Sequence, residues 1–271
     1  MVASGSADDT IRLWDVASGQ PVAKLEGHTA GVLALAFFPD GASLASGGVD
    51  KTIRLWPLSG DPKPRVVERH THHVTSLAFR KDGSLLASGS LDCTLLLGKP
   101  GADEAPASLS TRNTPVVCLS FHPEGRLLAA GYTDGSITLW DVDEKREVRT
   151  FNGHSGIVRS VAFRPDGSVL ASAGDDQRVV LWNAGEGSQV GLLQGHDQAV
   201  TSVTWSPDGA TIATGSFDKT VRLWEASGAA KEVLSGHAYG VLSVAFCPCG
   251  CTVASGSADR TVRLWRIQAP K

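Results

Sequence analysis

Three cysteines near the carboxyl end carry the most evident chemistry in the sequence. Cys247, Cys249 and Cys251 form a C-x-C-x-C pattern in the last hairpin of the chain, within the segment FCPCGC. Thiolates are ligands of soft metal ions, and residues i and i+2 of an extended chain point to the same side, so two of these thiolates could converge. Because no fourth ligand follows at a suitable spacing, we expect a reduced surface turn that holds no metal.

A histidine-rich run is the second candidate for metal chemistry. Residues 69–73 read Arg-His-Thr-His-His, and imidazole is a common metal ligand. No carboxylate or cysteine lies at a diagnostic spacing from the run, so we expect no metal here either. Motifs of enzyme active sites are also missing, including G-x-S-x-G, G-x-G-x-x-G after a strand, a phosphate loop with GK[ST], and H-E-x-x-H. These observations favour a protein that is not an enzyme and uses no cofactor.

The composition argues against several classes of protein. The 271 residues carry 25 Lys and Arg against 28 Asp and Glu, a net charge of −3, whereas a protein that wraps nucleic acid usually has a basic excess. No apolar run approaches the roughly 20 residues of a membrane-spanning helix, and the acidic amino terminus does not read as a signal peptide. Five cysteines are too few for a disulfide framework. We expect a cytoplasmic protein, with the nucleus as an alternative, and not a secreted one.

The elements that position these residues follow from an internal repeat. Six tryptophans recur at spacings of 42, 84, 42, 42 and 41 residues, and Gly98 stands at the midpoint of the double spacing. Seven copies of the repeat are therefore present, one of which has lost its tryptophan. The recurring tryptophans are Trp14, Trp56, Trp140, Trp182, Trp224 and Trp265.

Each copy contains four short segments typical of β-strands. The first, such as VTSVTWSPDG, is an apolar strand that leads into a Pro-Asp-Gly turn, in which proline sets φ and glycine accepts a positive φ. A second strand, an Asp-containing turn, a third strand ending in Leu-Trp and a shorter fourth strand follow. Strands without helical periodicity between them predict antiparallel all-β structure. Four strands in about forty residues match one blade of a β-propeller.

With these markers in register, the chain resembles the WD-repeat (tryptophan–aspartate) β-propeller family over its whole length. Four Gly-His pairs end 28 residues before a tryptophan, and an aspartate lies six residues before the tryptophan position in all seven copies. The pairs are Gly27-His28, Gly153-His154, Gly195-His196 and Gly236-His237, and the aspartates are Asp8, Asp50, Asp92, Asp134, Asp176, Asp218 and Asp259.

The resemblance implies a single all-β propeller domain over residues 1–271, which could be a segment of a longer chain. Counting the segments leaves the chain two strands short of seven full four-stranded blades. We expect seven antiparallel blades, of which the first lacks its innermost strand and the last its outer strand. The alternative is a six-bladed ring in which residues 21–26 extend the last blade and residues 1–15 are surplus.

Members of this family form a buried network within a blade from a His, a Ser or Thr, the turn Asp and the Trp, and the resemblance implies four such sets here. A Ser, a His and an Asp also suggest a nucleophilic triad, but a set that recurs once per blade favours a structural role. The sets are His28, Ser46, Asp50 and Trp56; His154, Ser172, Asp176 and Trp182; His196, Thr214, Asp218 and Trp224; and His237, Ser255, Asp259 and Trp265.

Two adjacent blades depart from this pattern. Gly98 replaces the tryptophan in the third copy, and Arg112 and Ala130 replace the histidine and the serine in the fourth. An orphaned buried polar group costs about 1–3 kcal/mol unless the site repacks. We therefore expect these two blades to be the softest part of the protein.

The resemblance also implies where partners bind, because WD-repeat proteins typically bind them on the narrow face formed by the loops that enter the blades and by the Asp turns. Apolar residues with a few charges at such positions suit a protein or peptide. The expected contact residues are Leu33, Val49, His73, Leu91, Pro115, Val117, Ile157, Arg159, Asp175, Phe217 and Leu242.

The function that we expect is a non-enzymatic scaffold that binds other proteins or peptides within a multi-subunit complex, with no nucleic-acid or membrane partner. The alternative is a sensor or regulatory propeller module of a larger enzyme or signalling protein. Substrate receptors of cullin-type ubiquitin ligases in this family carry Trp-Asp-x-Arg. The two Trp-Asp pairs of this sequence, at residues 14–15 and 140–141, lack that arginine, which argues against such a role.

Overall fold

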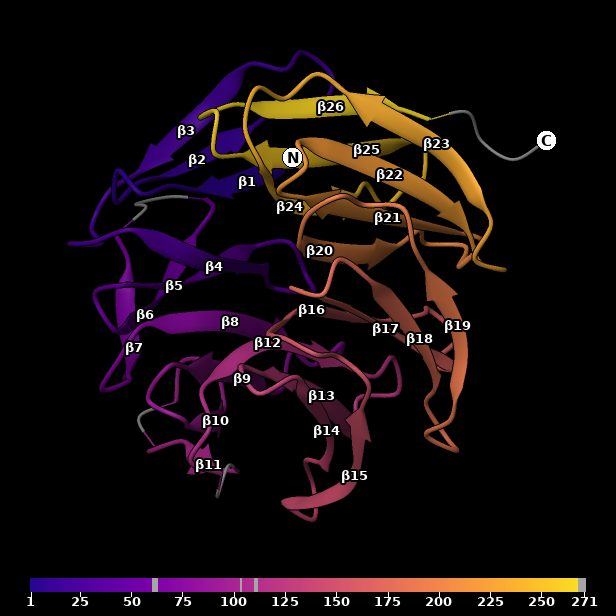
Figure 1. The fold of residues 1–271 in the computed structure, drawn as a ribbon. Coiled ribbons are helices and arrows are strands. Elements are labelled where there is room, and N and C mark those ends of the chain that lie inside the picture. The colour runs from indigo at the N-terminus through magenta and orange to yellow at the C-terminus, as the bar shows by residue number, and fades with distance from the viewer. Residues whose placement is uncertain (60–62, 103, 110–111, 268–271) are drawn as a thin grey trace. The chain divides into compact units, whose positions relative to one another are not determined.

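The computed structural model describes residues 1–59, 63–102, 104–109 and 112–267. Within these residues the chain forms strands β1 to β26 in seven sheets, each made of strands that are consecutive in the chain (Figure 1). The fold is an all-β, seven-bladed β-propeller whose first and last blades have three strands and whose other blades have four. Among the residues that the structure describes, none forms an apolar helix of membrane-spanning length.

The first three sheets take up the amino-terminal part of the chain. Their strands are β1 (Val2–Gly5), β2 (Ile11–Trp14) and β3 (Pro21–Leu25); β4 (Val32–Phe37), β5 (Ser43–Gly48), β6 (Thr52–Pro57) and β7 (Arg65–Arg69); and β8 (Val74–Phe79), β9 (Leu86–Ser90), β10 (Leu95–Gly98) and β11 (Ala107–Ser108).

The other four sheets follow in the same strand order. Their strands are β12 (Val116–Phe121), β13 (Leu127–Tyr132), β14 (Ser136–Asp141) and β15 (Arg146–Asn152); β16 (Val158–Phe163), β17 (Val169–Gly174), β18 (Val179–Asn183) and β19 (Gln189–Leu193); β20 (Val200–Trp205), β21 (Thr211–Ser216), β22 (Thr220–Glu225) and β23 (Ala230–Ser235); and β24 (Val241–Phe246), β25 (Thr252–Ser257) and β26 (Val262–Arg266).

The pairing of β3 decides between the two expected blade counts. This strand is antiparallel to β2, with Leu25 opposite Ile11, so residues 21–25 complete the first sheet. That sheet lacks the counterpart of β4, and the last sheet lacks the counterpart of β7. The prediction of seven blades is confirmed. The six-bladed alternative is wrong, because it needs residues 21–26 on the last sheet.

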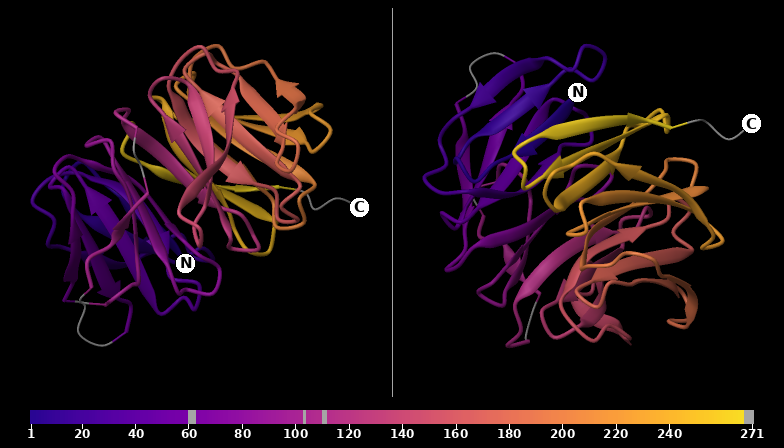
Figure 2. Two further views of the ribbon diagram at one scale, coloured as in Figure 1. Left: turned by 90° about the horizontal axis from the view of Figure 1, so that it is seen from below. Right: turned by 45° about the horizontal axis from the view of Figure 1, so that its top comes forward.

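Contacts divide the chain into two compact units, one of residues 1–130 with 139–148 and one of residues 131–138 with 149–271. In the second unit the fifth, sixth and seventh sheets, coloured orange to yellow, follow one another side by side (Figures 1 and 2). Leu181, Val200 and Ile212 are among the buried residues between the fifth and sixth sheets, and Val221 and Val241 are among those between the sixth and seventh. Equivalent clusters join the first three sheets in the first unit.

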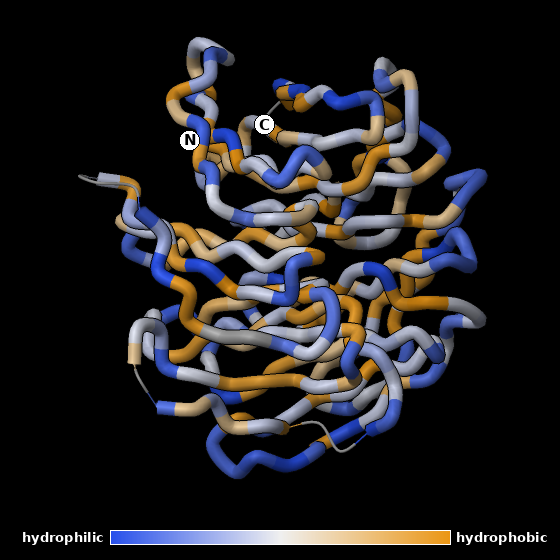
Figure 3. The backbone as a smooth tube through the Cα atoms, turned by 90° about the vertical axis from the view of Figure 1, so that its left-hand side faces the viewer, coloured by the Kyte–Doolittle hydropathy of each residue, from blue (hydrophilic) through white to orange (hydrophobic). Residues whose placement is uncertain are grey.

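Figure 3 shows how this core follows from the sequence pattern. Apolar segments run along the strands, whereas the turns between them are hydrophilic. Small residues let the sheets approach: a Cβ on Gly215 would lie 2.7 Å from Cγ1 of Val241 in the next sheet, and one on Gly47 would lie 2.5 Å from Cγ1 of Val74. Each sheet therefore buries its apolar side chains against its neighbours, which explains why the repeat must occur in tandem.

The Pro-Asp-Gly turns form as their residue types predict. In the fifth sheet Gly167 has φ +77°, the left-handed conformation that glycine adopts without strain. The carboxylate of Asp166 accepts hydrogen bonds from the backbone N–H of Ser168 at 2.9 Å and from its hydroxyl at 2.7 Å. Local side-chain bonds of this kind define the hairpin that joins the first and second strands of a blade.

Candidate protein-interaction site

Four sheets contain a continuous chain of hydrogen bonds from tryptophan to aspartate. In the second sheet Trp56 Nε1–H donates to Ser46 Oγ at 2.7 Å. Ser46 Oγ lies 2.6 Å from His28 Nε2, and His28 Nδ1 lies 2.8 Å from Asp50 Oδ2. The same bonds occur in the fifth, sixth and seventh sheets, among His154, Ser172, Asp176 and Trp182; His196, Thr214, Asp218 and Trp224; and His237, Ser255, Asp259 and Trp265.

Protonation gives this chain of bonds a direction. Burial lowers the pKa of His28. Burial acts to raise the pKa of Asp50, but hydrogen bonds from Thr52 and His28 outweigh it and hold that pKa below its usual range. A neutral imidazole that donates from Nδ1 to a carboxylate accepts at Nε2, so Ser46 donates its hydroxyl to His28. This is the connectivity of a catalytic triad, but Ser46 is fully buried and bonded to Trp56, out of reach of a substrate.

The same aspartates connect the two loops on which the expected contact residues lie. Asp50 accepts a hydrogen bond from the backbone N–H of Thr29 in the loop that enters the second sheet, at 3.1 Å. Val49, which precedes Asp50, donates its N–H to the carbonyl of Gly31 in that loop at 2.8 Å. Equivalent backbone bonds join residues 91 and 73, 175 and 157, 217 and 199, and 258 and 240. The entering loop and the Asp turn of these blades therefore lie at the same end of the sheet.

The third sheet holds its histidine without a tryptophan. His70 Nδ1 lies 3.0 Å from Asp92 Oδ2, and Nε2 lies 2.9 Å from Ser88 Oγ. His70 is thus engaged inside the sheet and is not available as a metal ligand, although it belongs to the histidine-rich run. In the described part of the chain, the run provides no group of three His, Cys, Asp or Glu ligand atoms.

The fourth sheet contains a buried tyrosine that sequence reasoning missed. In the fifth sheet the residue that matches this tyrosine in the repeat is Gly174. A Cβ on Gly174 would lie 2.8 Å from His154 Nδ1, so a blade that contains the histidine has room at this position only for glycine or another small residue. In the fourth sheet Arg112 replaces the histidine, and the position is Tyr132, which is fully buried and whose hydroxyl lies 2.9 Å from Thr138 Oγ1. A large aromatic residue where the other copies have glycine or serine was the available signal.

Three of the expected contact residues form a cluster in the second unit. The guanidinium of Arg159 binds the carboxylate of Asp175 through two nitrogens, Nε to Oδ1 and Nη2 to Oδ2, the latter at 3.0 Å. The Cζ atom of Arg159 lies 5.6 Å from the centroid of the Phe217 ring, a cation–π contact. Phe217 in turn lies over Gly240, where a Cβ would be 2.7 Å from Cδ1 of the phenylalanine. Loops of the fifth, sixth and seventh sheets thus meet at this point.

An exposed apolar edge borders this cluster. Leu242 is 49% exposed, as expected of a contact residue, and Tyr239 is 63% exposed. Tyr239 precedes Gly240 in the entering loop and is not among the expected contact residues. A single aromatic residue in a loop has no periodic signal that would mark it. Ile157, the remaining apolar residue among the expected contact residues of the second unit, is half-buried.

In the first unit the expected contact residues are more scattered in exposure. Leu33 is 52% exposed, whereas Val49 and Leu91 are half-buried. His73 is half-buried and its ring centroid lies 4.4 Å from that of His72. Pro115 and Val117 are also half-buried, and they lie on either side of the buried Val116 at the start of β12.

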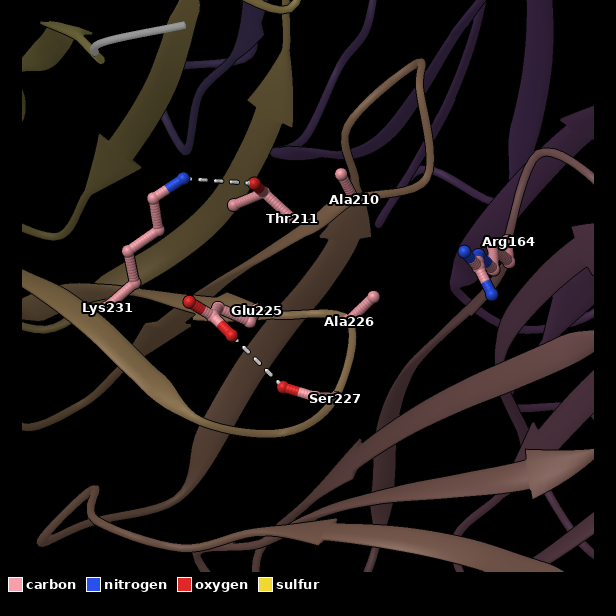
Figure 4. Close-up of a pocket in the computed structure, with 7 residues that line it drawn as sticks. All are labelled: Arg164, Ala210, Thr211, Glu225, Ala226, Ser227 and Lys231. Atoms are coloured by element: carbon pink, nitrogen blue, oxygen red, sulfur yellow. Dashed lines mark hydrogen bonds between the residues drawn. The ribbon is translucent and has the colours of Figure 1, made fainter. Parts of the chain in front are cut away.

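An open hollow of about 380 Å³ lies elsewhere in the second unit (Figure 4). Within it, Lys231 Nζ donates to Thr211 Oγ1 at 3.4 Å, and the Ser227 hydroxyl donates to Glu225 at 3.2 Å. The Ser227–Glu225 bond joins two exposed residues of one turn, and the residues that line the hollow include no histidine to act as a base for the hydroxyl. The lining residues are Arg164, Ala210, Thr211, Glu225, Ala226, Ser227 and Lys231.

Comparisons with known proteins agree with this architecture. The sequence profile described as "WD domain, G-beta repeat" matches residues 1–15, 19–57, 63–97 and 228–266. The profile described as "WD repeat-containing protein 75 first beta-propeller" matches residues 107–219.

Curated relatives match over about the length of one repeat. Nuclear distribution protein PAC1 of Mycosarcoma maydis is 56% identical over 43 residues, which are 16% of this chain and 10% of that protein. Ribosome assembly protein 4 of Chaetomium thermophilum is 49% identical over 43 residues, 16% of this chain and 8% of that protein. The chain therefore covers at most a tenth of the length of either relative. Taken with the two profiles and the seven sheets, these matches show that the chain belongs to the WD-repeat β-propeller family.

Proposed function

We propose that this chain is a non-enzymatic scaffold that binds a protein or peptide on the loops at the Asp-turn end of its blades. The observation that carries the proposal is the cluster of Arg159, Asp175 and Phe217 with the exposed Tyr239 and Leu242 beside it. Arginine and aromatic residues contribute most of the energy of protein interfaces, and apolar neighbours exclude water from them.

The geometry of the cluster suits binding because its side chains are already ordered. Asp175 holds Arg159 through two bonds, and Arg159 contacts the ring of Phe217. A side chain that is ordered before binding loses less conformational entropy on binding. The buried networks add to this, since they fix the loops on which these residues stand.

One observation supports a role without catalysis. The hydroxyl of every Ser-His-Asp set is buried, and in the second, fifth and seventh sheets a tryptophan also bonds it. We place the scaffold in a multi-subunit complex of the cytoplasm or nucleus. The relatives named for nuclear distribution and for ribosome assembly support this placement.

Affinity capture with matched variants tests the proposal. The double variant Tyr239→Ala/Leu242→Ala removes two exposed apolar side chains next to the cluster. Val190→Ala/Val233→Ala removes two side chains of similar exposure, 55% and 50%, from the outer strands β19 and β23. We expect both variants to melt close to the wild type, because exposed substitutions usually change stability by no more than about 0.5 kcal/mol.

Partner proteins that the wild type captures should be lost from the Tyr239/Leu242 variant and retained by the Val190/Val233 variant. Phe217→Ala should weaken the same captures. If the loop variant and the outer-strand variant capture the same partners equally well, the proposed surface is wrong.

A further inference from the structure

The turn that joins the first and second strands of a blade has the same backbone in the fifth and seventh sheets. It reads Arg-Pro-Asp-Gly-Ser at residues 164–168 and Cys-Pro-Cys-Gly-Cys at residues 247–251. Its fourth residue donates its N–H to the carbonyl of the first, at 2.8 Å for Gly167 and 2.9 Å for Gly250. Both glycines have φ in the left-handed region, +77° and +70°. The two turns therefore place their first, third and fifth side chains alike.

In two other blades, the third and the fifth, these three positions converge. In the third sheet Arg80 Nε–H donates to Asp82 Oδ1 at 3.0 Å, and the hydroxyl of Ser84 donates to the same oxygen at 2.6 Å. In the fifth sheet the hydroxyl of Ser168 bonds Asp166 in the same way, at 2.7 Å. In these two blades the first and fifth side chains both lie against the third.

In the seventh sheet the three converging side chains are all thiols. The sulfur atoms of Cys247, Cys249 and Cys251 lie within 4.8 Å of one another. Cys249 stands at the position of the turn aspartate and accepts the equivalent hydrogen bond. The N–H of Cys251 donates to Cys249 Sγ at 3.4 Å, and in the fifth sheet the N–H of Ser168 donates to Asp166 Oδ1 at 2.9 Å.

A disulfide uses only part of this arrangement. Cys249 is within reach of both Cys247 and Cys251, but one sulfur forms one disulfide, so oxidation consumes two thiols and leaves the third beside them. Only a ligand that all three sulfurs bind at once makes use of the whole cluster.

We propose that Cys247, Cys249 and Cys251 form a three-thiolate binding site for a soft metal ion, Cu(I). Thiolates select soft ions of this kind. Structural zinc sites have four protein ligands, whereas in the described part of the chain no further His, Cys, Asp or Glu joins these three. The Cys247 and Cys251 sulfurs are 3.8 Å apart, which is about the separation of two sulfurs bound to one metal at ~2.3 Å. The Cys249 sulfur is in bonding contact with both of them, so its side chain turns away from them when the ion binds.

The place of the turn makes this site independent of the proposed interaction surface. The cysteines lie between β24 and β25, whereas the Asp turn of the same blade lies between β25 and β26, at the opposite end of the sheet. Two of the three side chains are exposed. A Cu(I) donor or chelator therefore has direct access, and metal exchange needs no opening of the fold.

The test uses the full chain, reduced and desalted without oxygen, and titrated with Cu(I) in competition with a chromogenic Cu(I) chelator. We expect the wild type to withdraw one equivalent of Cu(I) from the chelator, with three sulfur neighbours in the X-ray absorption spectrum. The variant Cys247→Arg/Cys249→Asp/Cys251→Ser has the turn sequence of residues 164–168, which this chain already folds. It should melt like the wild type and lose that equivalent. Cys93→Ser, which changes a cysteine outside the turn, should retain it.

Three results would overturn the proposal. One is an absence of Cu(I) uptake by the wild type against the chelator. Another is equal uptake by the triple variant, which would place the bound copper elsewhere. The third is firmer retention of Zn(II) than of Cu(I), which would show that the cluster is not a copper site.

Discussion

In the fifth sheet His154 bridges Ser172 and Asp176 through its two ring nitrogens. In the fourth sheet Arg112 stands at the histidine position, and Tyr132, at the position that matches Gly174, is fully buried. Both sheets bury a large polar side chain whose polar atoms are hydrogen-bonded, but the side chains differ. A blade therefore does not require one particular set of residues, provided that its volume is filled and its central polar groups are bonded.

This comparison changes the expectation for the two blades that depart from the repeat. The fourth sheet has a buried tyrosine bonded to Thr138 and a strand, β14, that is buried along its whole length. The third sheet keeps its histidine bonds to Asp92 and Ser88 although Gly98 replaces the tryptophan. We therefore propose that the fourth sheet is stabilised by its own repacking.

Removal of the tyrosine from the fourth sheet is expected to have the largest effect on stability. Tyr132→Ala deletes a fully buried aromatic side chain, and we expect it to lower the free energy of unfolding by about 3–5 kcal/mol. Tyr132→Phe keeps the ring and loses only the hydroxyl, at a cost of about 1 kcal/mol. Chemical denaturation measures both. Equal stability of the two variants would show that the ring fills no space that the blade needs.

The next effect concerns the network of the fifth sheet. Burial acts to raise the pKa of Asp176, but hydrogen bonds from His154, the Ser155 backbone and Arg178 keep it low, so the residue is an ionised acceptor in the network. Asp176→Ala should destabilise the protein by about 1–3 kcal/mol, because its bonding partners lose their acceptor.

Asp134 is the matched control in the fourth sheet, where it bonds only the backbone N–H and hydroxyl of Ser136 among the contacts described. Asp134→Ala should cost less than Asp176→Ala. An unchanged melting temperature for Asp176→Ala would contradict the structural role of the network.

The smallest effect is expected at the arginine that replaces histidine. Arg112 Nε donates to Glu147 at 2.8 Å in a partly exposed pair, and such pairs contribute about 0–1 kcal/mol. Arg112→Ala should therefore change the melting temperature only slightly, whereas His154→Ala, at the matching position, should cost about 1–3 kcal/mol. Thermal unfolding measures the melting temperatures of the two variants. An equal fall in melting temperature would contradict the proposal that the fourth sheet is stabilised without the histidine network.

The repeat made most of the fold predictable. Period, number of repeats and strand order could be read from the sequence because each copy carries its own turn residues and its own alternating strands. The fate of residues 21–26 was less certain, since an outer strand can add to either of two sheets with equally good backbone bonds. Only the observed pairing of β3 with β2 separates these possibilities.

The sites were less accessible to sequence reasoning. Arg159 and Asp175 were expected contact residues because of their place in the repeat, but their ion pair and the contact with Phe217 join different blades. Tyr239 and Tyr132 were missed because each occurs once and follows no period. For the cysteines, alternation predicted that two thiols could converge, whereas the turn brings together all three.

By itself the sequence determined the elements of this protein, because strand alternation and turn chemistry act between residues that are near neighbours in the chain. The tertiary structure decided which sheet receives β3, that Tyr132 is buried in the fourth sheet, and which loop residues touch. Those outcomes depend on contacts between residues far apart in the chain, where volume and hydrogen bonding select one arrangement among several that the local pattern allows.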